Sequence, residues 1–404
     1  MSHLVRSVER LRNGGRALAA LLLLAVASAS APSIAQQANE SQVTTRIDLF
    51  DPEYNQKRAK IAWVDARGNL WVAAVDRKTG LFKPANGKGT LVDADALTSN
   101  DLKIVGNGPE WLPSSGPDRL VYTKFLPGRP HTYENARIAM AEQDPTTGKW
   151  THRFLTDKPT YRAYASDDAD DPAPRVTYVD PDGNPYWREV GNAATEAVVP
   201  GMEAPRVLAL RFSSGERAVV MVTEIDGRKQ IARWWHDEQR LEQLTFDGDH
   251  ETTSSPFIWK APEFGGDDVL VVTADNAREV RIYRRVDASR PEWTIQLRVR
   301  APIVGTKLSS AEPFVFDGAS YIFMSGVVPP NDFASAIFLA NIDPAAPFLR
   351  QLTPDSPVRT RTDPEVFITT TGPFIYYYRA DRSDTAPCPC YEGIWRTDTG
   401  LRAR

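Results

Sequence analysis

Charged side chains recur beside prolines along this chain, and they are the residues best suited to chemistry. Each stands at or next to a Pro that opens a short apolar run, and the set is Glu53, Glu110, Arg206, Glu312, Asp363 and Glu365. Two carboxylates at a suitable separation can hydrolyse a glycosidic bond, one as acid and the other as nucleophile or base. Such residues can also bind a ligand. Alternatively, they cap strand starts or pair with Arg206 and Arg361, and the sequence leaves these alternatives open.

Few other motifs offer catalytic chemistry. The sequence has no Gly-x-Ser-x-Gly elbow, Walker loop or dinucleotide fingerprint. After position 35 its histidines are scattered, at His131, His152, His236 and His250. This spacing argues against a His-rich metal centre, so we expect no metal and no cofactor. His250, in the acidic segment 247–251, could ligate a metal, but we expect a solvated loop there.

Only two cysteines occur, Cys388 and Cys390, separated by one proline. A disulfide between them would close a very tight ring, and the required geometry is hard to reach at that spacing. We therefore expect a local structural role, oxidised or not, rather than redox or metal chemistry.

The N-terminus predicts export. Four arginines precede the apolar run 17–27, which is too short to span a bilayer and is followed by the small residues Ser33-Ile34-Ala35. Residues 1–35 are thus interpreted as a secretory signal peptide, and the remainder as a periplasmic or secreted protein without a membrane span. The net charge of −4, with no basic block, argues against nucleic acid as a partner.

The elements that must position the charged residues are short strands. Helical periodicity is nearly absent, whereas β-branched and aromatic runs recur at 61–64, 70–75, 120–123, 218–223, 269–273, 320–324 and 374–378. Proline and glycine are spread evenly, without a linker. The predicted class is all-β, with 36–404 as one domain.

A repeated unit orders these strands. Leu97-Thr98, Leu244-Thr245 and Leu352-Thr353 are each followed by a Pro 11 residues after the Thr. That Pro is expected to start the first strand, because proline is tolerated there. The strongest apolar run forms the second strand, the third ends on an Asp-containing turn, and the Leu-Thr pair closes the fourth. Four strands in about 50 residues predict one blade of a β-propeller.

The number of blades follows from the proline positions 52, 109, 205, 256, 313 and 364. The interval from 109 to 205 is nearly two units long, and Ala173-Pro174-Arg175-Val176, with the runs near Tyr186-Trp187 and Ala197-Val198-Val199, is interpreted as an extra, degenerate blade. Seven blades are therefore favoured over six. The last unit lacks a fourth strand, so we expect residues 43–50 to pair with it and close the ring.

Several segments resemble the repeat of TolB-like propellers. They are Leu244-Thr245, Pro256-Phe257-Ile258-Trp259, 269–273 and 281–287, together with Gly108-Pro109-Glu110-Trp111 and 121–123. The resemblance covers most of the chain after position 35 and implies a fold but no function. The family's Ser-Pro-Asp-Gly turn is only hinted at in 112–116. The additional α/β domain of the family's namesake has no room here.

The first strand of each blade usually lines the central channel, so the charged set should converge at one mouth, where close carboxylates raise one another's pKa. Trp111, Trp259 and the segment 261–264 could pack between blades or stack on a sugar. We favour a monomeric binding or scaffold protein that captures a peptide, protein, glycan or small ligand at this mouth. The alternative is a glycoside hydrolase or lyase. Arabinanase-like propeller glycosidases have five blades, and their acid Glu precedes a small residue and Pro, whereas Glu263 follows Ala261-Pro262.

Overall fold

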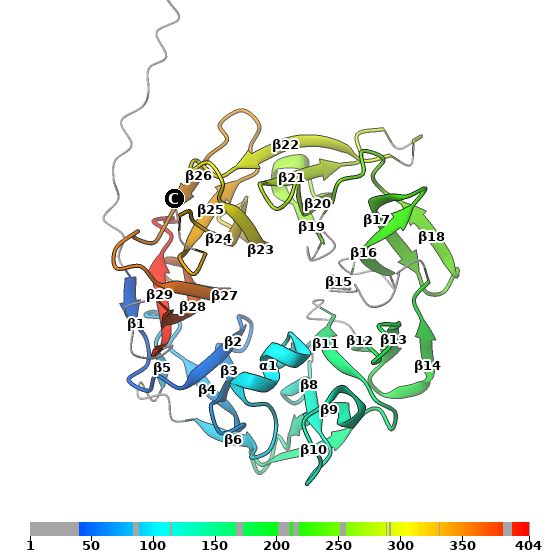
Figure 1. Cartoon of the computed structure of the whole chain (residues 1–404), viewed down its shortest axis with the longest axis vertical. Helices are drawn as coiled ribbons and strands as arrows, with labels where there is room; N and C mark the ends of the chain where they lie inside the picture. The colour runs from blue at the N-terminus through cyan, green and yellow to red at the C-terminus, as the bar shows by residue number, and fades with distance from the viewer. Residues whose placement is uncertain are drawn as a thin grey trace, which may run out of the picture. The chain divides into compact units, whose positions relative to one another are not determined.

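Seven antiparallel sheets are arranged in a ring around a central channel, as the computed structural model shows (Figure 1). The structure describes residues 40–83, 89–113, 115–166, 173–200, 211–212, 218–250, 256–287, 289–290, 292–330, 332–382 and 390–403, all within the compact unit Ala38–Arg404. Except in the sheet that the N-terminal strand completes, each sheet has its first strand nearest the channel, and strands that follow one another in the chain pair within the sheet. The predicted all-β propeller with seven blades is confirmed.

The first four blades follow the chain from β2 to β18. Blade 1 contains β2 (Leu49–Asn55), β3 (Lys60–Asp65), β4 (Leu70–Val75), β5 (Phe82–Lys83) and β6 (Thr90–Asp93), the last two both pairing with β4. Blade 2 contains β7 (Glu110–Leu112), β8 (Arg119–Phe125), β9 (Ala136–Gln143) and β10 (Trp150–Phe154). Blade 3 contains β11 (Tyr161–Ala165), β12 (Arg175–Val179), β13 (Pro185–Glu189) and β14 (Asn192–Val198). Blade 4 contains β15 (Arg211–Phe212), β16 (Ala218–Ile225), β17 (Arg228–Trp235) and β18 (Arg240–Gln243).

The remaining blades complete the ring. Blade 5 contains β19 (Phe257–Ala261), β20 (Asp267–Ala274), β21 (Glu279–Arg284) and β22 (Thr294–Arg300). Blade 6 contains β23 (Lys307–Phe316), β24 (Ala319–Val327), β25 (Ser335–Asn341) and β26 (Leu349–Gln351). Blade 7 contains β27 (Thr360–Thr369), β28 (Gly372–Asp381), β29 (Cys390–Asp398) and β1 (Glu40–Gln42). The described residues also form the short helices α1 (Ser99–Val105), η1 (Tyr133–Asn135) and η2 (Pro262–Phe264).

The core lies between neighbouring blades. The apolar runs predicted as second strands are the most buried segments, and their central residues Trp63, Val121, Val220, Val271, Phe323 and Tyr376 are all fully enclosed. Burial of these β-branched and aromatic side chains against the adjacent sheet supplies the main stabilisation. A blade alone would leave one such face in water, which is why the units stack as a closed ring.

The Leu-Thr pair forms a hydrogen-bonded clamp within its own blade. In blade 4, the Leu244 N–H donates to Ile231 O at 2.8 Å, and the Ile231 N–H donates to Thr245 Oγ1 at 2.9 Å. The corresponding contacts join Leu352-Thr353 to Ile337 at 2.8 and 2.9 Å. The threonine thus satisfies a buried N–H at or near the start of the third strand, which explains why the pair recurs.

The sequence pattern missed one such clamp and wrongly included another pair. Leu155-Thr156 makes it in blade 2, where Leu155 N–H donates to Ile138 O at 2.7 Å and Ile138 N–H donates to Thr156 Oγ1 at 3.1 Å. Leu97-Thr98 does not make it. Thr98 instead caps α1 in a capping box with Asp101.

An N-terminal strand closes the ring, as predicted, but the predicted range 43–50 is wrong. The strand is Glu40–Gln42, which pairs antiparallel with β29. Val43-Thr44 then makes the clamp of blade 7, with hydrogen bonds of 2.9 and 3.2 Å to Ile394. Leu49-Phe50 already belong to β2. Because Val43-Thr44 takes the place of a Leu-Thr pair, the closing strand must precede it.

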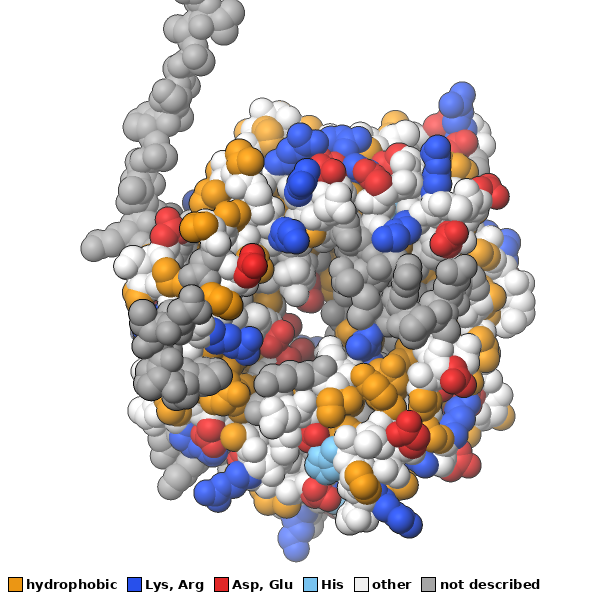
Figure 2. Space-filling model, viewed as in Figure 1, with side chains coloured by type: hydrophobic (Ala, Val, Ile, Leu, Met, Phe, Trp, Pro, Cys, Tyr) orange, Lys and Arg blue, Asp and Glu red, His pale blue; other side chains and the backbone are white. Residues whose placement is uncertain are grey.

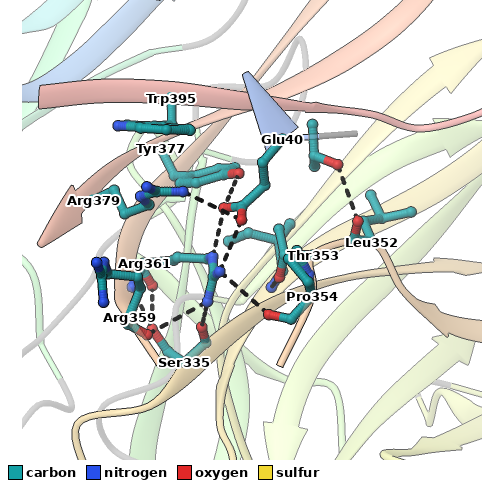
Figure 3. Close-up of polar contacts among 12 residues, drawn as sticks. Glu40, Ser335, Leu352, Thr353, Pro354, Arg359, Arg361, Tyr377, Arg379 and Trp395 are labelled. Carbon is teal, nitrogen blue, oxygen red and sulfur yellow. Dashed lines mark hydrogen bonds and ion pairs between the residues drawn. The ribbon is translucent and has the colours of Figure 1, made fainter. Parts of the chain in front are cut away.

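Charged side chains fasten this closing strand (Figure 3). Glu40 accepts hydrogen bonds from Arg361 Nε at 2.7 Å, Arg361 Nη2 at 2.9 Å, Tyr377 OH at 2.7 Å and Arg379 Nη1 at 3.3 Å. We call Glu40, Arg361, Tyr377 and Arg379 the closure cluster. Burial opposes ionisation of Glu40, but these donors more than offset it and lower the pKa of the carboxyl group. The guanidinium of Arg379 also stacks on Trp395, 3.1 Å from the ring centroid.

The expectation that every proline starts a strand is partly wrong. Pro109 and Pro256 do stand directly before β7 and β19, but Pro52, Pro313 and Pro364 lie inside strands. The pairing register shifts between Phe50 and Glu53, and likewise between Thr362 and Glu365. Pro52 and Pro364 occupy these β-bulges, where the missing N–H breaks no ladder hydrogen bond.

The extra blade exists, but its predicted opening is wrong. Blade 3 begins at Tyr161, and Ala173-Pro174-Arg175-Val176 leads into its second strand, β12. The pattern failed here because β11 has no proline. It keeps the bulge instead, with Arg162 at φ 59°.

Candidate functional site

Four glutamates occupy the same place in the innermost strands of four blades. Glu53 follows the bulge of β2, Glu110 begins β7, Glu312 follows the bulge of β23 and Glu365 that of β27. These strands belong to blades 6, 7, 1 and 2, which are consecutive around the ring. In blades 3 and 5 the corresponding residues are Tyr164 and Phe257. Arg206, predicted for blade 4, lies outside the described residues.

The four glutamates and two aspartates, Asp51 and Asp363, form what we call the acidic arc. Figure 2 shows acidic side chains on the wall of the hollow at the centre of the ring. The bulges bring the two aspartates there, because Asp51 and Asp363 adopt φ values of 53° and 52° and so turn the strand locally. Each member keeps part of its surface exposed although the blades enclose it.

Neighbouring innermost strands are tied together beside the arc. Trp111 Nε1 in β7 donates to the main-chain oxygen of Glu53 in β2 at 3.0 Å. Asn107 Nδ2 donates to Glu110 Oε1 at 3.1 Å and to Ala163 O of β11 at 2.6 Å. Blades 1, 2 and 3 are thereby held in register, and Trp111 has a structural role at the channel.

Enclosure and like charge both act on Glu53. Desolvation by the surrounding blades raises its pKa well above the ordinary value, and Glu365, Glu110, Asp51 and Glu312 raise it further. Among the described residues, no hydrogen bond or ion pair engages the Glu53 carboxylate. Glu53 thus meets charge from three other blades, which places these side chains near one another in space.

Asp51 is the residue that the sequence reasoning missed. Its pKa is raised well above the ordinary value, first by burial and then by Asp363 and Glu110, although the Gly108 backbone lowers it. Its Oδ2 is buried without a hydrogen-bond partner among the described residues. A Cβ on Gly108 would lie 1.6 Å from that oxygen, so only glycine leaves room for this carboxylate. The match of Asp51-Pro52-Glu53 to Asp363-Pro364-Glu365 was the signal that could have found it.

Asp363 has a mixed environment. Burial raises its pKa, while a hydrogen bond from Thr362 and the charge of Arg382 lower it, and the net direction is upward. An arc of enclosed carboxylates with raised pKa can hold a cation, share protons, or donate a proton to a bound substrate.

The other predicted site residues do not join the arc. Arg361 binds Glu40 in the closure cluster and so does not pair with the channel acids. Trp259 is buried between blades and donates to Ser320 Oγ at 3.1 Å. Glu263 in η2 accepts from the same Ser320 hydroxyl at 2.8 Å, so this segment links blade 5 to blade 6.

His250 is buried, although its neighbours Asp247 and Asp249 are exposed, so the expectation of a solvated loop is wrong only for the histidine. Its side chain is fully enclosed, and Nε2 lies 3.0 Å from Thr245 Oγ1 and 3.3 Å from Asp247 Oδ1. The acidic neighbours are held by Arg281, which donates to Asp247 and Asp249. The loop therefore packs on the clamp of blade 4, and no metal-ligand cluster of His, Cys, Asp and Glu occurs among the described residues.

Two further observations concern the last blade. Cys390 begins β29 and has no disulfide to a described residue, whereas Cys388 lies outside the described range, so their pairing stays untested. A pocket of about 300 Å³ lies beside the closure cluster, and residues from 328–330, 334–336, 354–355, 358–359 and Arg361 line it. Its two arginines are already neutralised, Arg361 by Glu40 and Arg359 by Glu392 at 2.8 Å.

Comparison with known proteins places the fold. No protein-family model matches the chain, and no curated protein matches its sequence. The β-propeller domain of Cps50 (Swd1) from Myceliophteria thermophila is similar in structure, with a TM-score of 0.55 and 12% identity over 90% of this chain and 99% of that one. TolB from Acinetobacter baumannii gives a TM-score of 0.40 and 14% identity over 85% of this chain and 79% of that one. At these identities the likeness concerns the fold alone, which is a seven-bladed β-propeller of antiparallel sheets.

Proposed function

We propose that this protein is a periplasmic or secreted binding propeller whose channel mouth captures a ligand through a cationic group. The observation that supports it most is the acidic arc, to which four consecutive blades contribute carboxylates. Enclosing like charges costs folding free energy, and a bound ammonium or guanidinium group would offset that cost. A peptide, a protein segment or a small amine can supply such a group.

Binding should be coupled to protons. Glu53, Asp51 and Asp363 have raised pKa values, so they retain protons to higher pH than ordinary carboxyl groups. A cation favours their charged forms, and its binding should therefore release protons and strengthen as pH rises.

Titration calorimetry with trilysine tests the proposal. Glu110→Gln and Asp363→Asn should each weaken binding about tenfold or more while leaving folding intact. Glu238→Gln is the matched control, because Glu238 is exposed and pairs only with Arg240 at 2.8 Å among the described residues. Triglutamate should not bind. Absence of trilysine binding, or equal binding by all variants, would contradict the proposal.

A glycoside hydrolase is the second candidate, and the raised pKa of Glu53 beside other carboxylates favours it. A general acid needs such a pKa, and a neighbouring carboxylate can act as nucleophile or base. Seven blades, where arabinanase-like glycosidases have five, weigh against it. A screen of glycans decides: in an enzyme, one of Glu53→Gln, Glu110→Gln and Asp363→Asn should abolish turnover while substrate still binds.

The location rests on the N-terminal pattern. Export should leave a chain that begins near Gln36, and mass spectrometry of the exported protein checks this. Recovery of residues 1–35 intact would refute it. Among the described residues, no helix has the length and apolar character to cross a membrane.

A further inference from the structure

A second pocket lies between blades 2 and 3, away from the acidic arc. Its volume is about 660 Å³, and it is lined by β9, by the connection from β10 to β11, and by β13 and β14. Leu126, Phe154 and Ala193 give it apolar walls, and Arg137 and Arg188 bring two guanidinium groups. We propose that this pocket binds an organic oxyanion, a carboxylate or phosphate attached to an apolar body.

Arg188 carries the argument. The residue is only 5% exposed, yet its Nη1 donates to the main-chain oxygen of Leu155 at 2.8 Å and its Nε to that of Glu189 at 3.3 Å. Among the described residues, no carboxylate pairs with it directly. A buried guanidinium without an anion is costly, and its planar donors suit bidentate binding of an oxyanion.

Arg137 repeats this arrangement from the neighbouring blade. Its Nε donates to Asp157 O at 3.0 Å, and its Nη1 donates to Glu134 O and Ala136 O at 2.9 and 2.7 Å. All three acceptors are main-chain carbonyls. These bonds fix the guanidinium in place without neutralising it, and Arg137 is only partly exposed.

The two acidic residues at the pocket leave this positive charge in place. Glu196 is already engaged by Lys158 Nζ at 2.6 Å and by the hydroxyl of Tyr178. Asp157 is exposed, and its carboxylate makes no ion pair with either arginine, although its charge acts on Arg137 through space. The arginines of the pocket beside the closure cluster differ, because both are paired with carboxylates.

The apolar walls define the rest of the ligand. Phe154 is 37% exposed at the end of β10, where a large apolar side chain gains little from facing water. An aromatic or aliphatic group attached to the oxyanion could cover Phe154, Leu126 and Ala193 while its charged end meets the guanidinium groups.

Phenyl phosphate, phenylacetate and inorganic phosphate are suitable probes, and titration calorimetry measures them against the whole protein. We expect saturable binding of an aromatic anion that is tighter than that of inorganic phosphate. Preference between phenyl phosphate and phenylacetate identifies the acid group. Arg137→Gln should weaken binding about tenfold to a hundredfold, as expected for loss of a charge-assisted hydrogen bond.

Three further variants make the test specific. Arg77→Gln is the matched control, since Arg77 also donates to main-chain carbonyls, of Gln56 and Lys57, but is exposed on blade 1. Arg188→Gln removes the buried charge and could prevent folding, so Arg188→Lys, which keeps the charge, is tested instead. Arg188→Lys should weaken binding less than Arg137→Gln does. Glu110→Gln should leave anion binding unchanged, which separates this site from the acidic arc. Absence of binding by the folded protein, or binding that Arg137→Gln and Arg188→Lys do not alter, would overturn the proposal.

Discussion

Two groups of enclosed carboxylates in this ring have opposite surroundings. In the closure cluster, Glu40 meets two guanidinium groups and a phenol, and its pKa is lowered although burial opposes ionisation. In the acidic arc, Glu53 meets other carboxylates, and burial and neighbours together raise its pKa. The charged form of a glutamate is therefore stabilised in blade 7, at Glu40, and destabilised in blade 1, at Glu53.

The difference in surroundings suggests different roles: the closure cluster holds the closing strand in place, and the acidic arc is the candidate binding site. A compensated buried charge links segments that are far apart in sequence, and its loss leaves its partners unpaired. Enclosed carboxylates that raise one another's pKa oppose folding in their charged form, and such clusters at concave surfaces are common at functional sites. Stability measurements can test both halves of this contrast.

The largest effect should come from removing the closing strand. Deletion of 36–44 takes away β1, the Val43-Thr44 clamp and Glu40, and it leaves Arg361 without its carboxylate, whereas Arg379 keeps Glu392. We expect a loss of more than about 5 kcal/mol in the free energy of unfolding, measured by urea denaturation. A chain beginning at Glu40 is the control and should keep its stability. An unchanged melting temperature after the longer deletion would contradict the closure.

Glu40→Gln should have the next largest effect. Removing one partner of a buried ion pair typically costs about 3–5 kcal/mol, and the Glu40 side chain is only 6% exposed. Glu142→Gln, which breaks a half-buried pair with Arg119 that water still reaches, should cost less than about 1 kcal/mol.

The pH dependence of Glu40→Gln has a definite sign. Because the folded state lowers the pKa of Glu40, its contribution is complete above the ordinary value of 4.5 and is lost as pH falls through the folded value. The difference in the free energy of unfolding between the wild type and this variant should therefore become smaller at acid pH. A difference that grows below pH 4 would rule out the assignment.

Glu53→Gln should act in the opposite direction. The folded state raises the pKa of Glu53, so the penalty is absent below the ordinary value of 4.5 and develops as pH rises through the folded value. At pH 8 the variant should be more stable than the wild type by about 1 kcal/mol, the size of a typical single substitution. At pH 4 the two should be equal. Urea denaturation at both values checks this, and a less stable variant at pH 8 would contradict the contrast.

The sequence predicted the second strands of the blades better than it predicted the bulges and the closing strand. Periodic apolar runs bounded by turns predict the second strands, because enclosed residues such as Val220 and Phe323 have to be apolar. The bulges were not predicted, because Asp accepts a positive φ more readily than most residues but the identity of Asp51 or Asp363 does not show that a strand bends there. The closing strand was predicted too late in the chain, at 43–50, because Val43-Thr44 stands where a Leu-Thr pair was expected.

The sites were predictable in proportion to their regularity. Glu53, Glu110, Glu312 and Glu365 recur with the repeat, and the structure brings them to one arc, although their ligand-binding role stays a prediction. Glu40 was missed because its partner Arg361 lies 321 positions away. Arg137 and Arg188 were missed because their acceptors are main-chain carbonyls, which have no signature in sequence.

Added salt should change stability least, and it should distinguish the acidic arc from the closure cluster most directly. Raising the salt concentration from 0.1 to 1 M shortens the screening length from about 10 Å to about 3 Å, which weakens interactions between charges that water can reach. The arc carboxylates keep exposed surface in the channel, so their repulsion should be partly screened. The stability difference between the wild type and Glu53→Gln at pH 8 should then shrink by a few tenths of a kcal/mol. The difference between the wild type and Glu40→Gln should stay constant, because Glu40 and Arg361 are 6% and 2% exposed and short hydrogen bonds hold them. Equal salt dependence in the two variants would mean that the clusters do not differ in their access to water, and the distinction between fastening and binding would lose its physical basis.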